Sequence, residues 1–227
     1  MEGVGKIHIF DGQGKRLQKT LDFPGTVNEL DFSEDDKLLA AVGDKTARVY
    51  DTETFEVIHD WTLPKEDGPY AKTLGYINTK INPDASLLAV GGTFGWVFIY
   101  DLETSEEVRR LSKISEKTET VAWSLEGRHL LVAGNGMFID VYRTADILND
   151  DYEDSEQIPF ALRVPMTDAL EYMDFNENKT MLTTAHQDGT VQLWTFMSDD
   201  PTINERMHRK VRREQDKVAQ AEGRKTN

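Results

Sequence analysis

Apolar and polar positions follow one another along the chain in a unit that occurs four times. Each copy predicts a half-buried strand, a polar turn, a short apolar strand, a tight turn and a third strand ending in an aromatic residue. The period of about 40 to 50 residues is typical of repeat proteins built from small β-sheets. The copies are anchored on Phe32, Ile81, Trp123 and Phe175, and they reach the aromatic residues Tyr50, Tyr100, Tyr142 and Trp194.

The second strand of each unit is a short apolar run bounded by turn residues, which indicates burial on both faces. These runs are 38–43, 87–92, 129–134 and 181–186. Polar residues that favour turns precede each run. A second tight turn follows it, most clearly at Asn135-Gly136 and Asp188-Gly189, where a positive φ costs little. Two hairpins per unit make an antiparallel meander, which is one propeller blade.

The last unit carries the motif Asp188-Gly189-Thr190-Val191-Gln192-Leu193-Trp194, which resembles the turn, third strand and terminal tryptophan of the WD40 repeat family. The resemblance covers roughly residues 4 to 196. Tyr50-Asp51 and Tyr100-Asp101 stand where the family has its Trp-Asp pair. No Gly-His pair opens a unit, so the histidine-centred hydrogen-bond tetrad of the family is carried over to no residue.

We therefore predict an all-β, WD40-like propeller of four-stranded antiparallel blades in residues 1–197, followed by a basic, helical or disordered tail in 198–227. First strands are expected near 27–32, 76–81, 120–123 and 170–175. A third strand at 6–11 and an outer strand at 16–21 come before them. The expected units are a half blade at 4–22 and blades at 26–61, 74–111, 118–148 and 169–196.

About four and a half blades fall short of the seven or eight that the WD40 resemblance implies. An open propeller exposes strand edges and apolar blade faces, which invite pairing with other chains. Three explanations stay open from the sequence. The chain is a fragment of a longer propeller, a partner chain completes the ring, or a small ring of four or five blades closes by itself.

Composition fits a folded body with one sizeable core, because 38% of the 227 residues are hydrophobic. No apolar stretch is long enough to cross a bilayer, and the N-terminus lacks the profile of a signal peptide, so neither membrane insertion nor secretion is predicted. The absence of cysteine removes disulfides, thiolate metal sites and thiol catalysis. The expected location is the cytoplasm, with the nucleus as the alternative.

Charge divides the chain into an acidic body and a basic tail. Residues 205–227 hold eight Lys/Arg and four Asp/Glu, a net charge of +4, which leaves −19 for residues 1–204 out of the total of −15. Such a body disfavours contact with nucleic acid phosphates, so RNA is expected only at the tail. Met207, Val211, Val218 and Ala221 add a faint coiled-coil seam, which predicts either a helix that docks on a partner or a solvated end. The candidate basic residues are Arg206, Arg209, Lys210, Arg212 and Arg213.

The sequence offers few signs of chemistry. Its five histidines show no metal-ligand spacing, and neither a nucleophile elbow nor a phosphate-binding loop is present. We therefore assign no catalytic, cofactor or metal residues, and a propeller enzyme is only an alternative. His186 is expected to hydrogen-bond at a blade turn, and Trp61, Trp96 and Trp123 are expected to lie in the core or to pack between blades rather than to line a ligand face.

Two long connections are the better places for binding residues, because loops on a rigid scaffold carry specificity. The connection 64–73 offers Tyr70 as an amphipathic contact. The insertion 145–159 offers Asp150, Asp151 and Tyr152 within an acidic stretch. It lacks the central glycine of a helix-loop-helix calcium loop, so a basic partner or a solvated insertion is expected there.

These features predict a non-catalytic scaffold for protein–protein interaction within a multi-protein complex. Blade edges, loops and the tail would supply the contacts, and preorganised loops would lose little entropy on binding. The alternative is an RNA- or ribosome-associated, translation-related WD40 factor that reaches RNA through its tail. Fold alone does not decide between these functions.

Overall fold

The computed structural model describes residues 4–63, 74–93, 95–111, 117–152, 157–177 and 179–195. These residues form five antiparallel sheets, in which neighbouring strands follow chain order. The sheets are β1 (Val4–Phe10) and β2 (Leu17–Pro24); β3 (Glu29–Phe32), β4 (Leu38–Gly43), β5 (Thr46–Asp51) and β6 (Val57–Thr62); β7 (Tyr76–Ile81), β8 (Leu87–Gly92), β9 (Val97–Asp101) and β10 (Glu107–Leu111); β11 (Thr118–Trp123), β12 (His129–Gly134), β13 (Phe138–Arg143) and β14 (Leu162–Pro165); and β15 (Leu170–Phe175), β16 (Met181–His186) and β17 (Val191–Thr195).

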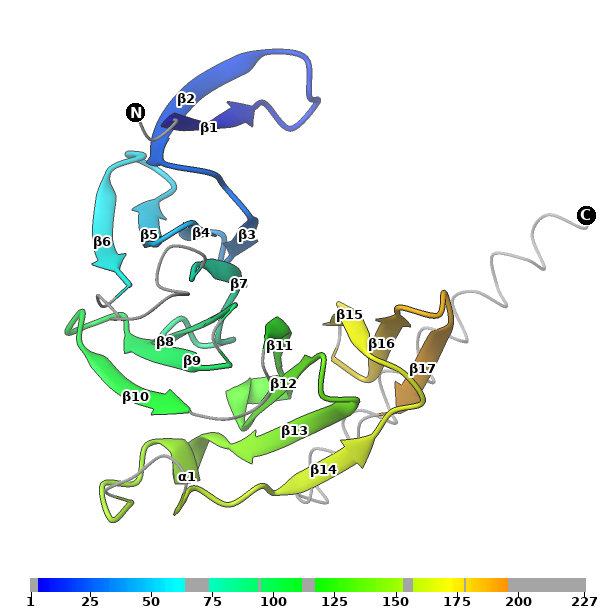
Figure 1. Ribbon diagram of the computed structural model, residues 1–227. Helices are drawn as coiled ribbons and strands as arrows, with labels where there is room; N and C mark the ends of the chain where they lie inside the picture. Colours follow the sequence, from blue (N-terminus) through cyan, green and yellow to red (C-terminus); the bar gives the residue numbers. More distant parts are fainter. Residues whose placement is uncertain are drawn as a thin grey trace, which may run out of the picture.

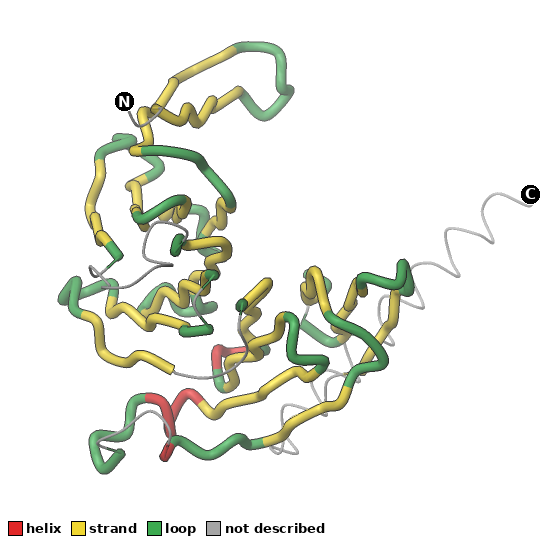
Figure 2. The backbone as a smooth tube through the Cα atoms, in the orientation of Figure 1, coloured by secondary structure: helices red, strands yellow, loops and turns green. Residues whose placement is uncertain are grey.

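The sheets succeed one another along an arc, as the blades of a propeller do (Figure 1). Strands β3, β7, β11 and β15 lie on the concave side, and β6, β10 and β14 lie on the outside. The sheet of β1 and β2 stands at one end of the arc, and the sheet of β15 to β17 stands at the other. The described residues include a 3-10 turn at Leu125–Gly127 and the short helix α1 (Thr144–Ile147) (Figure 2). The prediction of an all-β, propeller-like fold is confirmed.

The second strands β4, β8 and β12 are buried because sheets pack on both of their faces. In β4, Ala40 and Val42 join the core cluster shared with β7 and β8, whereas Leu39 and Ala41 join the cluster shared with β1 and β2. Every residue of β8 and β12 is buried. This explains why the second strands read as unbroken apolar runs rather than as alternating ones.

The hairpin turns carry the strained backbone. Asp36, Ala85 and Lys179 close equivalent first turns with φ values of 60°, 59° and 55°. Gly189 takes a φ of 83° in the second turn of the last unit, as its Asp-Gly sequence predicts. In the third unit the left-handed residue is Met137, with a φ of 53°, rather than the expected Gly136.

Side-chain hydrogen bonds join the inner strands of neighbouring sheets. The N–H groups of Thr79 and Ile81 in β7 donate to the carboxylates of Glu29 and Asp31 in β3, both at 2.8 Å. Further along the arc, Asn78 donates to the carbonyl of Thr118 at 2.6 Å. These bonds satisfy edge groups that no backbone ladder reaches. The series also includes the bonds from Asn28 to the carbonyl of Tyr76, from the indole of Trp123 to the carbonyl of Lys80, and between Thr120 and the backbone of Met173.

The third sheet extends further along the sequence than the repeat pattern suggests. Its outer strand, β14, lies beyond the acidic insertion and pairs with β13 through Ile139 and Val164. The expected unit ended at residue 148, because the insertion separates the third strand from the outer one. The sheet of β15 to β17 has three strands within the described residues.

His186 closes a hydrogen-bonded chain in the last sheet. The indole N–H of Trp194 donates to Oγ1 of Thr184 at 2.9 Å, and this hydroxyl lies 3.0 Å from Nε2 of His186. Nδ1 of His186 is 3.3 Å from the carbonyl oxygen of Asp168. The order of donors places the imidazole proton on Nδ1. The predicted structural role of His186 is confirmed.

Thr184→Val removes the hydroxyl but keeps the shape of this buried side chain. The indole N–H and Nε2 of His186 would both lose a partner, so we expect a loss of about 1–3 kcal/mol in the free energy of unfolding. Urea unfolding followed by tryptophan fluorescence measures it. Thr184→Ser should retain most of the stability, and equal losses in both variants would contradict the role of the hydroxyl.

Candidate functional site

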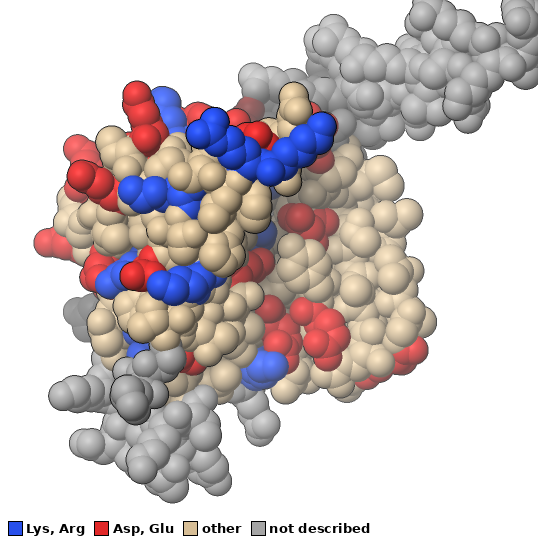
Figure 3. Space-filling view, turned by 90° about the horizontal axis from the view of Figure 1, so that it is seen from above, with Lys and Arg blue, Asp and Glu red and all other residues tan. Residues whose placement is uncertain are grey.

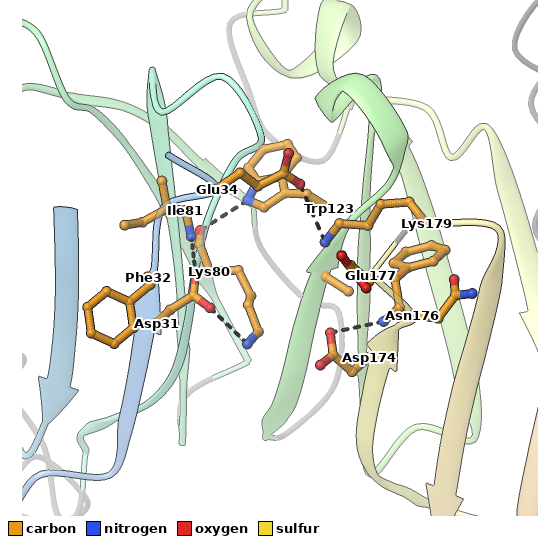
Figure 4. Close-up of a pocket in the computed structure, with 12 residues that line it drawn as sticks. Asp31, Phe32, Glu34, Lys80, Ile81, Trp123, Asp174, Asn176, Glu177 and Lys179 are labelled. Carbon is orange, nitrogen blue, oxygen red and sulfur yellow. Dashed lines mark hydrogen bonds and ion pairs between the residues drawn. The ribbon is translucent and has the colours of Figure 1, made fainter. Parts of the chain in front are cut away.

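A cavity of about 410 Å³ lies where the inner strands end, on the concave side of the arc. We call it the channel-mouth pocket. Figure 4 shows side chains from different sheets facing one another across it. Its charged and aromatic lining includes Asp31, Glu34, Lys80, Trp123, Asp174 and Lys179.

The repeat places these residues. The penultimate positions of β3, β7 and β15 are Asp31, Lys80 and Asp174, and all three line the channel-mouth pocket. Because these strands lie side by side along the concave face, equivalent positions bring residues far apart in sequence to one cavity (Figure 4). The polar turns that follow β3 and β15 add Glu34 and Lys179, whose charged atoms are 3.9 Å apart.

Lys80 is the centre of a buried charge cluster. Its Nζ is 3.0 Å from Oδ1 of Asp31 and 3.7 Å from Oε1 of Glu29. The three side chains are only 15–18% exposed. The second oxygen of each carboxylate accepts a backbone N–H from β7. All three charged groups therefore have partners, which is the condition for burying them at tolerable cost.

The cluster shifts the protonation of its members. Burial raises the pKa of Asp31 and of Glu29 above the usual range, against the opposing effect of Lys80. Burial alone would lower the pKa of Lys80, but the attraction of Asp31 and Glu29 outweighs it, so that the pKa of this amine lies above its usual value. Lys80 therefore remains charged in the folded protein.

The geometry suits recognition better than acid–base chemistry. Asp31 is committed to Lys80 and to the N–H of Ile81, and Trp123 is committed to the carbonyl of Lys80. Within the described ranges, no three His, Cys, Asp or Glu side chains are grouped to hold a metal ion. Sequence reasoning missed this pocket, although the penultimate residues of the first strands would have indicated it.

The acidic insertion is anchored by Arg109 of β10. Its guanidinium donates to the carbonyl oxygens of Ile147, Asn149 and Tyr152 at 2.9, 3.0 and 2.8 Å. Tyr152 also packs against the core cluster of β8 to β13. The chain on either side of Asp150 and Asp151 is thus fixed, and Asp151 lies exposed at the surface.

The other predicted residues divide between core and undescribed segments. Trp123 is buried in the core, Trp61 stacks on Tyr100 with ring centroids 4.4 Å apart, and Trp96 lies under the guanidinium of Arg110 at 5.0 Å. Trp61 and Trp96 also pack against the core cluster shared by the sheets of β3–β6 and β7–β10, and Trp123 belongs to the cluster shared with the sheet of β11–β14. The predicted packing in the core or between blades is confirmed for these three tryptophans. The predicted contact Tyr70 and the five basic tail residues Arg206, Arg209, Lys210, Arg212 and Arg213 lie outside the described residues.

Comparison with known proteins agrees with this architecture. The family model for the WD domain, G-beta repeat, matches residues 15–51, which run from β2 through the three strands β3, β4 and β5. This match identifies one WD40 repeat in residues 15–51. The Protein LST8 homolog of Drosophila melanogaster is 26% identical to this chain over 229 residues, covering 83% of the chain and 72% of the relative. The WD40 match thus spans the outer strand of one sheet and the first three strands of the next.

No helix in the described residues of this chain is long and apolar enough to cross a bilayer. The WD40 resemblance predicted from the repeats is confirmed.

Lys80→Met leaves Asp31 and Glu29 buried without their cation, so we expect a loss of about 3 kcal/mol in the free energy of unfolding at about pH 8. Both carboxylates would then have folded-state pKa values raised further above their unfolded values near about 4. A group whose pKa is higher in the folded than in the unfolded protein stabilises the fold at pH values below its unfolded pKa. This contribution is lost as the pH rises through the folded pKa. The deficit should therefore shrink when unfolding is measured at about pH 5.

The matched control is Lys37→Met, which removes an exposed ion pair with Asp35. This change should leave the free energy of unfolding nearly unaltered at both pH values. A Lys80→Met deficit that does not depend on pH would contradict the charge cluster.

Proposed function

We propose that this WD40 chain is a non-catalytic scaffold subunit of a multi-protein complex. The observation that carries the proposal is a set of loops and pocket residues held rigidly by the blades, such as the insertion fixed by three hydrogen bonds from Arg109. Rigid loops bind with little loss of conformational entropy. A chain of this kind holds partners at fixed angles to one another.

The acidic insertion is the proposed contact for a basic partner surface. Asp150 and Asp151 project from a backbone that Arg109 fixes, and the body of the chain carries a net charge of −19. Such a field attracts basic proteins over a distance and raises the rate of association. The same field repels nucleic acid from the body.

The second candidate is an RNA-associated WD40 factor, favoured by the net charge of +4 in residues 205–227. RNA binding would then depend on the tail alone. Its affinity would fall steeply with salt, because phosphate contacts release counterions.

The test replaces Asp150 and Asp151 with lysine in the full chain. Native sizing of a source-cell lysate then measures the fraction of the chain that migrates in a complex. We expect roughly a tenfold fall in the affinity for the partner and a weaker dependence on salt, since the change reverses charges at a steered interface. The matched control is Glu53→Lys with Glu56→Lys, an exposed acidic pair in a turn of another sheet, which should leave the complex intact.

A chain that migrates only at its own mass of 25.8 kDa would contradict the scaffold function. Replacement of Arg206, Arg209, Lys210, Arg212 and Arg213 with glutamine separates the second candidate. Cross-linking to RNA that survives these changes would rule out RNA binding through the tail.

A further inference from the structure

In each of three successive sheets, the face that is turned toward the next sheet is apolar and is covered by that next sheet. In the third strands, the residues on this side are Ala47 and Val49 of β5, Val97 and Ile99 of β9, and Ile139 and Val141 of β13. All six are buried in the core clusters between neighbouring sheets. Each of these core clusters is closed by the inner and second strands of the following sheet.

The equivalent positions in the third strand of the last sheet, β17, are also apolar, but they are exposed to solvent. Val191 pairs with Ala185 in the register that Val97 has with Gly91 and Ile139 has with Ala133. Val191 is 66% exposed and Leu193 is 67% exposed. We call this surface the end face and define it by Tyr172, Asp174, Thr183, Ala185, Val191 and Leu193.

Figure 3 looks down on the molecule from the side of β1 and β2. The surface over the sheet of β15 to β17, on the right of this view, shows mostly uncharged side chains. Exposed apolar side chains such as Val191 and Leu193, gathered on one sheet face, indicate an interaction site.

The inner strand of the end face repeats the charge arrangement of β3. Asp174 is the penultimate residue of β15, as Asp31 is of β3. Asp31 holds Lys80 and the N–H of Ile81, both from the next sheet. Oδ1 of Asp174 accepts the N–H of Phe175, and its Oδ2 has no partner among the described residues. By this equivalence, Asp174 is suited to a basic side chain and a backbone N–H from a further inner strand.

We propose that the end face binds a β-sheet of another protein, whose innermost strand carries a lysine or arginine opposite Asp174. Apolar side chains of that sheet would cover Val191 and Leu193, as β7 and β8 cover Ala47 and Val49. The inference rests on the scaffold function proposed above and names the kind of partner that one surface takes.

Residues 196–227 and a second copy both lack the required chemistry. Residues 196–227 contain no run of three consecutive apolar residues, so they offer no counterpart to the apolar second strands β4, β8 and β12. Two copies would bring together bodies that each carry a net charge of −19, which repel. A basic strand from a different chain matches both the apolar side chains and Asp174.

The chain lacks cysteine, so a single cysteine gives a site-specific probe. Leu193→Cys in the full chain is labelled with a benzophenone maleimide, irradiated in a source-cell lysate and analysed by mass spectrometry of the cross-linked peptide. Val57→Cys, an exposed apolar position on the outer strand β6, is the matched control. Circular dichroism melting verifies that each variant is folded.

The expected product joins the labelled Leu193→Cys side chain to a strand of a different protein with alternating apolar residues and a lysine or arginine, and Val57→Cys does not yield it. Asp174→Lys added to Leu193→Cys should lower the yield roughly tenfold, because it opposes two cations in a desolvated contact. A cross-link only to residues 196–227, only to a second copy, or at the level of Val57→Cys would overturn the proposal. If the complex persists in native sizing while Leu193→Cys fails, the end face is wrong and the scaffold function stands.

Discussion

The arrangement of the sheets depends on hydrogen bonds that side chains of one inner strand make to the backbone of the next. The inner strands are the last in their ladders, so their outward N–H and C=O groups have no neighbouring strand to pair with. Buried backbone groups of this kind need partners. Glu29, Asp31 and Asn78 supply them across the boundary between sheets. Apolar packing alone, which has no direction, would not fix the position of one sheet against the next.

The same requirement explains the charge in the channel-mouth pocket. Two carboxylates that accept N–H groups must be buried near the concave surface, and Lys80 compensates their charge. The pocket is therefore a consequence of how the sheets are joined as well as a place where polar groups converge. At the last sheet, Asp174 presents the same group without a following sheet in the described residues.

The apolar runs and turn residues were sufficient to predict the inner and second strands. A strand that is buried on both faces has consecutive apolar residues, as at 38–43 and 87–92. The outer strand β14 could not be found, since the insertion separates it from β13 and four residues carry little pattern. The bonds between inner strands join residues 40 to 53 positions apart. A sequence gives no such pairing until the register of the sheets is known, so Lys80 and its carboxylates were missed.

Hydrogen exchange measured by NMR tests the central role of these bonds most directly. The N–H of Ile81 donates to the carboxylate of Asp31 and not to the carbonyl of a neighbouring strand. It should nevertheless be protected from exchange as strongly as an amide hydrogen-bonded between two strands. Asp31→Ala should lower that protection by roughly tenfold or more while the amides within the β8–β9 ladder keep theirs. An Ile81 amide that exchanges freely in the unaltered chain, or that stays protected in Asp31→Ala, would contradict this role.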